Sequence, residues 1–257
     1  MTPAPGVRVC VRLEMLILAF DTTSERGGAA IFQDEECLAS VANEGPTTFY
    51  SVTLFQMVDR LVSEARAKQR AQVEKLSDIE LFAVTNGPGS FTGIRVGLAA
   101  AQGWATAFGR PARGVSVLEA MVEEAQPETE LAIPVLNARR GEFYLQAFRR
   151  RADSGGTRFV AAAKGLVLKP EGVSRFFAEG ASPEGSATGL FREHDDAAVS
   201  LRASLPAEIA WRSVPGTLLR AVARLAVRAE GQGEFATPAG LDAYYIRRSD
   251  AELNWKD

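Results

Sequence analysis

The stretch VTNGPGSFTGIRVG, Val84–Gly97, constrains the fold more than any other part of the sequence. It follows an apolar run that reads as a strand and precedes a helix rich in glycine and alanine. Glycine and proline at this density mark a turn where the backbone comes close to another group. That group is a phosphate in many nucleotide-binding folds. It can equally be a packed protein segment, so the stretch leaves open an enzyme and a protein-binding subunit.

Under the phosphate interpretation, the glycine-rich turn and the end of the first strand form an anion site. The residues that would contact a nucleotide are Asp21, Thr22, Thr23, Gly87, Gly89, Ser90 and Thr92. The spacing is neither GxGxxG nor GxxxxGK[ST], and no lysine follows the turn. Under the structural interpretation, Asp21 caps a turn and either Ser90 or Thr92 caps the helix.

Small residues recur every four positions along the following helix, at Gly93, Gly97, Ala101 and Ala105. This spacing lets two helices approach closely. Because an interior glycine costs about 1 kcal/mol relative to alanine, a packing reason is expected. The packed element is either the helix expected over residues 48–68 of the same chain or a helix of a partner.

Composition excludes several other classes of function. The net charge of -3 and the pI near 5.5 give no global electrostatic reason to bind nucleic acid. With His194 as the only histidine, no HxxxH or HExxH metal site can be built from imidazoles. No GxSxG nucleophile elbow occurs. A local RNA-facing patch stays open at Arg139-Arg140, Arg149–Arg151 and Arg247-Arg248, although hairpin ends and tails commonly carry such charges.

The order of apolar runs predicts an α/β fold with mixed sheets flanked by helices. In the first half, three strands from Leu16 onward form an antiparallel meander, followed by a helix over 48–68, a strand over 80–85 and a helix over 90–108. In the second half we expect a hairpin around Ala138–Gly141, a solvated turn over 149–158, a loose polar segment over 182–196, a helix over 206–230 and a tail with a strand-like start.

Two lobes are expected. Residues 1–14 are predicted to be a disordered extension, 15–115 a first lobe, and 116–257 a second lobe whose C-terminal helix and tail pack back on the first. No apolar run approaches the roughly 18 to 20 residues that span a bilayer. The short run Met15–Phe20 is no signal-peptide core either, so we expect a cytoplasmic protein without membrane contact.

Several motifs together resemble the TsaB (YeaZ) family, whose members are also called glycoprotease-like. They are ILAFDTTSERGGAAI, NGPGSFTGIRVGLAAAQGWA, GVSVLEAM, NARRGEFY and YYIRRSDAELNWK. The resemblance runs from about Met15 to Lys256. It implies the ASKHA fold, which is like that of actin, Hsp70, sugar kinases and RNase H, with two similar lobes. NARRGEFY places Asn137 where the commoner family form has an acidic residue.

The resemblance also implies a function in tRNA modification. The chain would be the non-catalytic scaffold or activating subunit of the complex that makes N6-threonylcarbamoyladenosine at A37. It would dimerise with a TsaD transferase, recruit a TsaE ATPase, meet tRNA only through the complex and form a homodimer when alone. No catalytic residue, metal or cofactor is implied, apart from weak or shared nucleotide contact in the complex. The alternative is an ATP-dependent phosphotransferase of the same fold that acts on a small molecule.

The family's partner interface lies on the two helices of the first lobe. Carried onto this sequence, it comprises Phe49, Val52, Thr53, Gln56, Gly97, Ala101 and Trp104. TsaD-type subunits hold a metal through an HxxxH pair on the first of these helices. The corresponding segment TTFYSVTLFQMVDRLV contains no histidine, so no metal is expected here.

Overall fold

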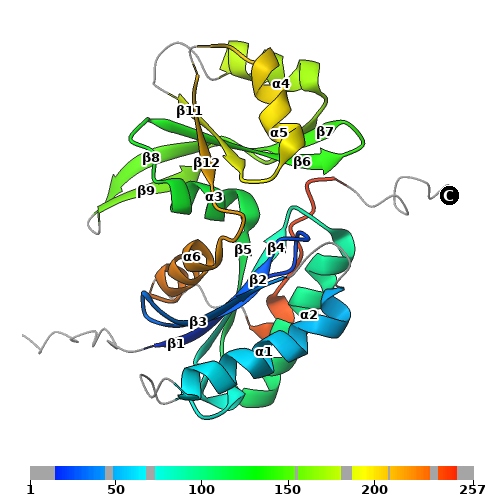
Figure 1. The fold of residues 1–257 in the computed structure, drawn as a ribbon. Helices are drawn as coiled ribbons and strands as arrows, with labels where there is room; N and C mark the ends of the chain where they lie inside the picture. The colour runs from blue at the N-terminus through cyan, green and yellow to red at the C-terminus, as the bar shows by residue number, and fades with distance from the viewer. Residues whose placement is uncertain are drawn as a thin grey trace, which may run out of the picture.

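Two β-sheets, with helices between them and outside them, form the part of the chain that the structure describes (Figure 1). In this computed structural model the described residues are 15–43, 49–67, 73–153, 156–180, 187–207, 209–231 and 237–247. The expected extension 1–14 lies outside them. The predicted lobe boundary at residues 115 and 116 falls at the end of the first sheet and stays a prediction.

The first sheet contains the expected meander and has the order β3-β2-β1-β4-β5. Its strands are β1 (Leu16–Asp21), β2 (Gly28–Gln33), β3 (Glu36–Ala42), β4 (Leu81–Gly87) and β5 (Ala112–Ser116). The first three pair antiparallel, whereas β1, β4 and β5 pair parallel. Every residue of β1 is buried, which explains why LILAFD is apolar almost throughout.

The second sheet repeats this pattern of pairing in the order β10-β7-β6-β11-β12. Its strands are β6 (Leu131–Arg139), β7 (Glu142–Leu145), β10 (Leu166–Leu168), β11 (Ala187–Arg192) and β12 (Ala210–Val214). Again two antiparallel pairs are followed by two parallel pairs. The expectation of two similar lobes is therefore confirmed. A further hairpin of β8 (Phe148–Asp153) and β9 (Gly156–Ala161) extends from β6.

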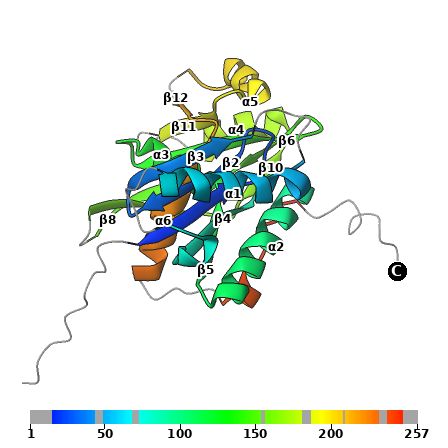
Figure 2. The ribbon, with the colours of Figure 1, turned by 60° about the horizontal axis from the view of Figure 1, so that its bottom comes forward.

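The helices form three layers around the two sheets, as Figures 1 and 2 show. Helices α1 (Tyr50–Ala67) and α2 (Phe91–Phe108) cover the outer face of the first sheet. Helices α3 (Val117–Ala125) and α6 (Leu219–Gly231) fill the space between the sheets, with α6 packed on β1, β4 and β5. Helices α4 (Pro170–Gly180) and α5 (Asp196–Leu201) cover the second sheet. Short 3-10 turns lie at Leu76–Asp78, Arg202–Ser204 and Pro238–Gly240.

Several expectations for the second half are wrong. Residues 149–153 and 156–158, expected to be part of a turn, belong to strands β8 and β9, and β11 lies inside the segment expected to be loose. The helix over 206–230 begins only at Leu219, because 210–214 form β12. Strands β11 and β12 are held by parallel pairing with segments distant in sequence, which local periodicity does not report. Residues 241–247 of the tail form no strand in the described part of the chain.

Candidate functional site

The glycine-rich turn comes close to the chain's own backbone at the end of β1. A Cβ added at Gly93 would lie 1.9 Å from the carbonyl oxygen of Thr22, and one added at Gly89 would lie 2.5 Å from that of Thr23. Side chains do not fit at these separations. The glycines are therefore required because α2 begins directly against the Thr22-Thr23 turn.

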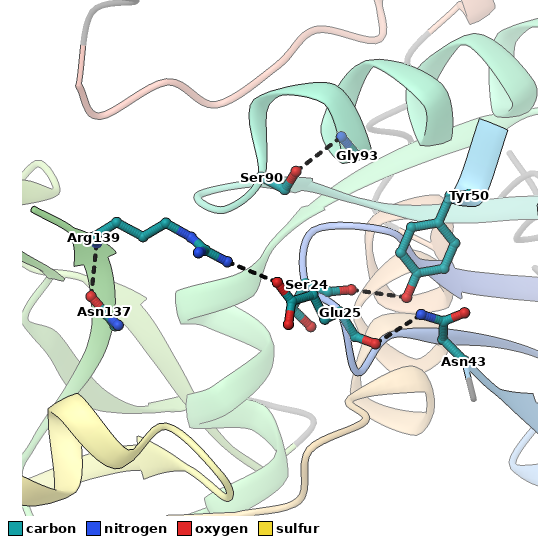
Figure 3. A network of polar contacts seen from close by, with 8 residues as sticks. All are labelled: Ser24, Glu25, Asn43, Tyr50, Ser90, Gly93, Asn137 and Arg139. Carbon is teal, nitrogen blue, oxygen red and sulfur yellow. Dashed lines mark hydrogen bonds and ion pairs between the residues drawn. The ribbon is translucent and has the colours of Figure 1, made fainter. Parts of the chain in front are cut away.

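Hydrogen bonds join this turn to the start of α2. The Ser90 amide donates to the Thr23 carbonyl over 2.7 Å, and the Thr22 hydroxyl donates to the Gly93 carbonyl over 2.7 Å. Ser90 Oγ accepts from the Gly93 amide at 3.2 Å (Figure 3), which confirms Ser90 as the helix cap. Two of the amides that could hold a phosphate at this terminus are thus already bonded within the chain.

Asp21, the last residue of β1, is fully buried and bonded at both carboxylate oxygens. Its Oδ1 accepts from the Thr23 amide at 2.9 Å, the Thr23 hydroxyl at 2.6 Å and the Thr85 hydroxyl at 2.8 Å. Its Oδ2 accepts from Arg192 Nη2 at 2.5 Å. Arg192 ends β11 and is 4% exposed, so the ion pair joins the carboxyl ends of two inner strands from different sheets.

The protonation state of Asp21 follows from these contacts. Burial raises the pKa of Asp21, but the Arg192 guanidinium and the hydrogen bonds from Thr23 and Thr85 outweigh burial and hold the pKa below its ordinary value. The carboxylate is therefore charged at neutral pH, and its charge is balanced by the other lobe rather than exposed to a ligand.

The structure brings together all seven residues predicted to contact a nucleotide, but most of them face the chain itself. Asp21, Thr22 and Thr23 are buried and bonded to their neighbours. In this structure Thr22 packs on the glycines and Asp21 binds Arg192, and contact of either residue with a nucleotide stays a prediction. Of the seven, Ser90 and Thr92 are exposed.

A second ion pair crosses the junction nearer the surface. Arg139, at the end of β6, reaches Glu25 in the turn after β1, with 3.1 Å between Nη2 and Oε1 (Figure 3). That turn is held by Tyr50 and Asn43: the Tyr50 hydroxyl donates to the Ser24 carbonyl at 2.9 Å, and the Asn43 amide donates to the Glu25 carbonyl at 2.8 Å. The turn is thus fixed relative to α1 and β3.

The segment 241–247, which we call the C-terminal strap, also binds both lobes. On the first lobe, the Gln102 amide donates to the Leu241 carbonyl at 2.9 Å and the Tyr244 amide donates to the Asn86 carbonyl at 2.8 Å. The Tyr244 carbonyl covers Gly87, since a Cβ there would lie 2.6 Å from it. On the second lobe, the Gly165 amide donates to the Tyr244 hydroxyl at 3.2 Å.

The outer side of α1 carries a row of exposed apolar side chains. Phe49 just before the helix, Val52 and Phe55 are 72%, 65% and 54% exposed. We call these three residues the α1 ridge. Gln56, on the next turn of the helix, is exposed, and Thr53 is half-buried with its hydroxyl donating to the Phe49 carbonyl. Contiguous exposed apolar side chains mark surfaces that bind other proteins.

Three residues predicted to face a partner are instead buried. A Cβ at Gly97 would lie 2.3 Å from the Thr22 hydroxyl, Ala101 is fully buried, and Trp104 packs on Phe20 and Phe82. The prediction that a partner packs on the small-residue row from Gly93 to Ala105 is therefore wrong, because these residues are buried and face the chain's own sheet.

A different small-residue row on α2 is exposed, at Ala99, Gly103 and Ala107. A Cβ added at Gly103 would meet no described atom within 4 Å. Phe55 of α1, which the sequence did not mark as an interface residue, contacts Trp104 of α2 edge-on at 5.4 Å between ring centroids. Its spacing three residues after Val52 was the available signal for its exposure.

In the described ranges, no group of three or more His, Cys, Asp or Glu side chains is placed so that it could hold a metal ion. None of the helices in the described ranges is long and apolar enough to cross a membrane.

Solved structures share this architecture. YeaZ from Pseudomonas aeruginosa has 25% sequence identity, covers 90% of this chain and 100% of its own, and superposes with a TM-score of 0.67. The component A of (R)-2-hydroxyglutaryl-CoA dehydratase from Acidaminococcus fermentans shares the fold alone, with 9% identity and a TM-score of 0.50 over 86% of this chain and 99% of its own. The expected ASKHA fold is thereby confirmed as the class of this protein.

The sequence comparisons define the family more narrowly. The family model described as TsaD, tRNA N6-adenosine threonylcarbamoyltransferase, matches residues 49–205. The TsaB protein of Escherichia coli strain K12, a tRNA threonylcarbamoyladenosine biosynthesis protein, is 31% identical over 61% of this chain and 64% of its own length. TsaB of Bacillus subtilis strain 168 is 28% identical over 51% and 53%. The matches thus span less than two thirds of these relatives. The chain belongs to the TsaD family and, within it, to the TsaB (YeaZ) proteins.

Proposed function

We propose that this protein is a non-catalytic scaffold in the biosynthesis of N6-threonylcarbamoyladenosine at A37 of tRNA. It pairs with a TsaD-type transferase through α1 and α2, and the pair recruits a TsaE-type ATPase. The names of the TsaB relatives support the pathway. When alone, the chain uses the same face to form a homodimer.

The single observation that carries the proposal is the α1 ridge beside the exposed row on α2. Phe49, Val52 and Phe55 offer a hydrophobic surface on α1, and on the neighbouring α2 a Cβ added at the exposed Gly103 would meet no described atom within 4 Å. Glycine at an exposed helical position lowers the stability of the isolated chain by about 1 kcal/mol. A partner helix that packs on Gly103 provides a reason for that cost.

The ion pair at the junction supports a scaffold over a phosphotransferase. A phosphotransferase would need a free carboxylate in the place where ligands meet the carboxyl ends of the strands. Asp21 holds that place, but it is bonded to Arg192, Thr23 and Thr85. We therefore propose that the free chain binds no nucleotide through Asp21, and that any nucleotide contact at Ser90 or Thr92 forms only within the complex.

The test is reconstitution of the modification with the transferase, the ATPase, the enzyme that supplies threonylcarbamoyl-adenylate, and unmodified tRNA. We expect formation of the modified nucleoside to require this chain and to be abolished by Val52→Arg, which places a charge on the α1 ridge. Ala67→Arg is the matched control, because Ala67 is also exposed on α1 but lies at its C-terminal end, about four turns from Val52. Full modification without the chain would refute the proposal.

A nucleotide titration of the free chain tests the alternative function. We expect no heat of binding with ATP and Mg²⁺ in calorimetry. ATP binding together with phosphate transfer to a small molecule by the isolated chain would establish the phosphotransferase instead.

A further inference from the structure

We propose that a cavity beside α3 and α6 binds a free amino acid, with the ligand's ammonium at Asp34 and its carboxylate at Arg224. The cavity has a volume of about 380 Å³, toward the lower end of the range for small-molecule sites. It shares no lining residue with the α1 ridge or with the Asp21–Arg192 pair, so the proposal does not depend on the proposed function. We call it the α3–α6 cavity, and its charged and amide lining residues are Asp34, Glu35, Glu123, Gln126, Arg224 and Arg228.

The walls of the α3–α6 cavity come from elements of both sheets. Asp34 and Glu35 lie in the turn between β2 and β3 of the first sheet, and Thr157 lies on β9 of the second sheet. The last turn of α3 and one face of α6 complete the walls, and Figure 1 shows these two helices between the sheets. A ligand bound there would therefore contact both lobes.

Two ion pairs hold the walls in place. Glu123 is 7% exposed and accepts from Arg228 Nη1 and Nη2 at 3.0 Å each, and Gln126 Nε2 donates to the same carboxylate at 3.1 Å. Glu35 Oε2 accepts from Arg224 Nη2 at 2.9 Å. Because these contacts fix the side chains before a ligand arrives, little ordering would accompany binding.

One carboxylate and part of one guanidinium are left over from these pairs within the described ranges. Asp34 Oδ1 accepts from the Met15 amide at 2.8 Å, which leaves the negative charge of the carboxylate in place, and no ion pair joins Asp34 to a cation there. Arg224 is bonded through Nη2 alone, and its Nε is buried without a hydrogen-bond partner. Its side chain is 34% exposed, so a ligand can reach the guanidinium.

These leftover groups select the chemical class of the ligand. The lining carboxylates outnumber the lining arginines three to two, which disfavours a simple anion, and a simple cation would leave Arg224 unmatched. A molecule that carries both an ammonium and a carboxylate satisfies both sides. The last turn of α3 also favours the ammonium, since the C-terminus of a helix carries a partial negative charge.

The two groups are within reach of one small molecule. Asp34 directly precedes Glu35, and Glu35 binds Arg224, so the Asp34 carboxylate and the Arg224 guanidinium flank the same ion pair. Both line one cavity whose volume suits a single amino acid better than a folded partner. The free amino acid is therefore the ligand that matches both the charges and the size.

The test is calorimetric titration of the full free chain with each of the common L-amino acids at low salt. We expect at least one of them to bind with a Kd below about 1 mM. The N-acetyl derivative of that amino acid lacks the ammonium, and its amide lacks the carboxylate. Each derivative should bind at least tenfold more weakly, because charge-assisted hydrogen bonds are the strong ones.

Two substitutions test the assigned side chains. Asp34→Asn and Arg224→Gln should each weaken binding of the amino acid at least tenfold. Asparagine tolerates the left-handed backbone at Asp34, where φ is 51°, and its oxygen can still accept from the Met15 amide. The turn should therefore stay folded in this variant, which urea unfolding checks.

The matched controls change the same charges outside the α3–α6 cavity. Asp59→Asn lies on the exposed side of α1, and Arg220→Gln lies on α6 one turn before Arg224. Arg220 donates to the Glu35 carbonyl, so its variant also reports whether a loosened β2–β3 turn is enough to weaken binding. Both controls should bind the amino acid as the wild type does.

Several results would overturn the inference. They are no binding of any amino acid by the wild type up to about 10 mM, undiminished binding of the N-acetyl and amide derivatives, and losses in the two controls equal to those at Asp34 and Arg224. Tighter binding of methylamine or of acetate than of any amino acid would do so too, because the cavity would then hold a single charge. The transferase takes no part in these measurements, so their outcome and that of the scaffold test are independent.

Discussion

Arg192 and Asp21 form a buried ion pair between the carboxyl ends of β11 and β1, with 2.5 Å between Nη2 and Oδ2. The pair lies where two lobes of repeated topology meet. At this place one lobe provides the cation and the other lobe provides the anion.

Removing one partner of the Asp21–Arg192 pair should lower the free energy of unfolding by more than removing both. Arg192→Met leaves the Asp21 carboxylate buried without its cation, and we expect it to lower the free energy of unfolding by about 3–5 kcal/mol. The double variant Asp21→Asn/Arg192→Met should lose less than the sum of the two single variants. Urea unfolding of the wild type, the two single variants and the double variant measures the coupling energy of the pair. Strictly additive losses would show that the pair does not couple the lobes.

The Asp21–Arg192 pair should also make the stability of the protein depend on pH in the acid range. Burial raises the pKa of Asp21, but Arg192, Thr23 and Thr85 together lower it by more, so the folded pKa lies below the unfolded value of about 3.9. The stabilisation is therefore fully present above that pH and is lost as the pH falls through the folded pKa. The difference in stability between the wild type and Asp21→Asn should shrink below about pH 4. A difference that stays constant down to the acid transition contradicts the assignment.

Two glycines of α2 should respond in opposite ways to the same substitution. Gly97→Ala places a Cβ 2.3 Å from the Thr22 hydroxyl and should lower the free energy of unfolding by about 1–3 kcal/mol. Gly103→Ala meets no described atom within 4 Å and should raise it by about 0.5–1 kcal/mol. Thermal and urea unfolding of the isolated chain check both. Stabilisation by Gly97→Ala would mean that α2 does not lie against the β1 turn.

The C-terminal strap should hold the two lobes together through Tyr244 rather than through Tyr245. Tyr244→Ala removes the acceptor of the Gly165 amide and the ring beside Gly165, and should cost about 1–3 kcal/mol. Tyr245→Ala, at an exposed side chain, should change stability by about 0.5 kcal/mol or less. Amide hydrogen exchange should show faster exchange at Gly165 in the first variant. Equal effects of the two substitutions would remove this role from the strap.

The sequence predicted most of the first lobe because its elements are long and periodic. The meander from Leu16 and the helix capped by Ser90 were correct, as was the hairpin at Ala138–Gly141 in the second lobe. The second lobe was harder, since β11 and β12 are short and take their stability from parallel neighbours far away in sequence. Local propensity carries little information about such strands.

The sequence predicted which residues come together at the candidate site, but not which way their side chains face. The residues around Asp21 and the glycine-rich turn do come together, yet no spacing rule reveals that Arg192, 171 residues later, neutralises the carboxylate. On α2, small residues occur at several helical registers. Only the position of the sheet decides that Gly97 faces inward and Gly103 outward.

The central claim is that the outer face of α1 and α2 binds a TsaD-type transferase. The most direct test is titration calorimetry of this chain with its own organism's transferase, comparing the wild type with Val52→Arg and Gly103→Arg. Unfolding curves show that each variant is folded. The claim predicts a stable complex for the wild type and at least a hundredfold weaker binding for both variants, because an arginine there buries a charge and overlaps the partner. Wild-type affinity in both folded variants, or no complex with the wild type, would contradict it.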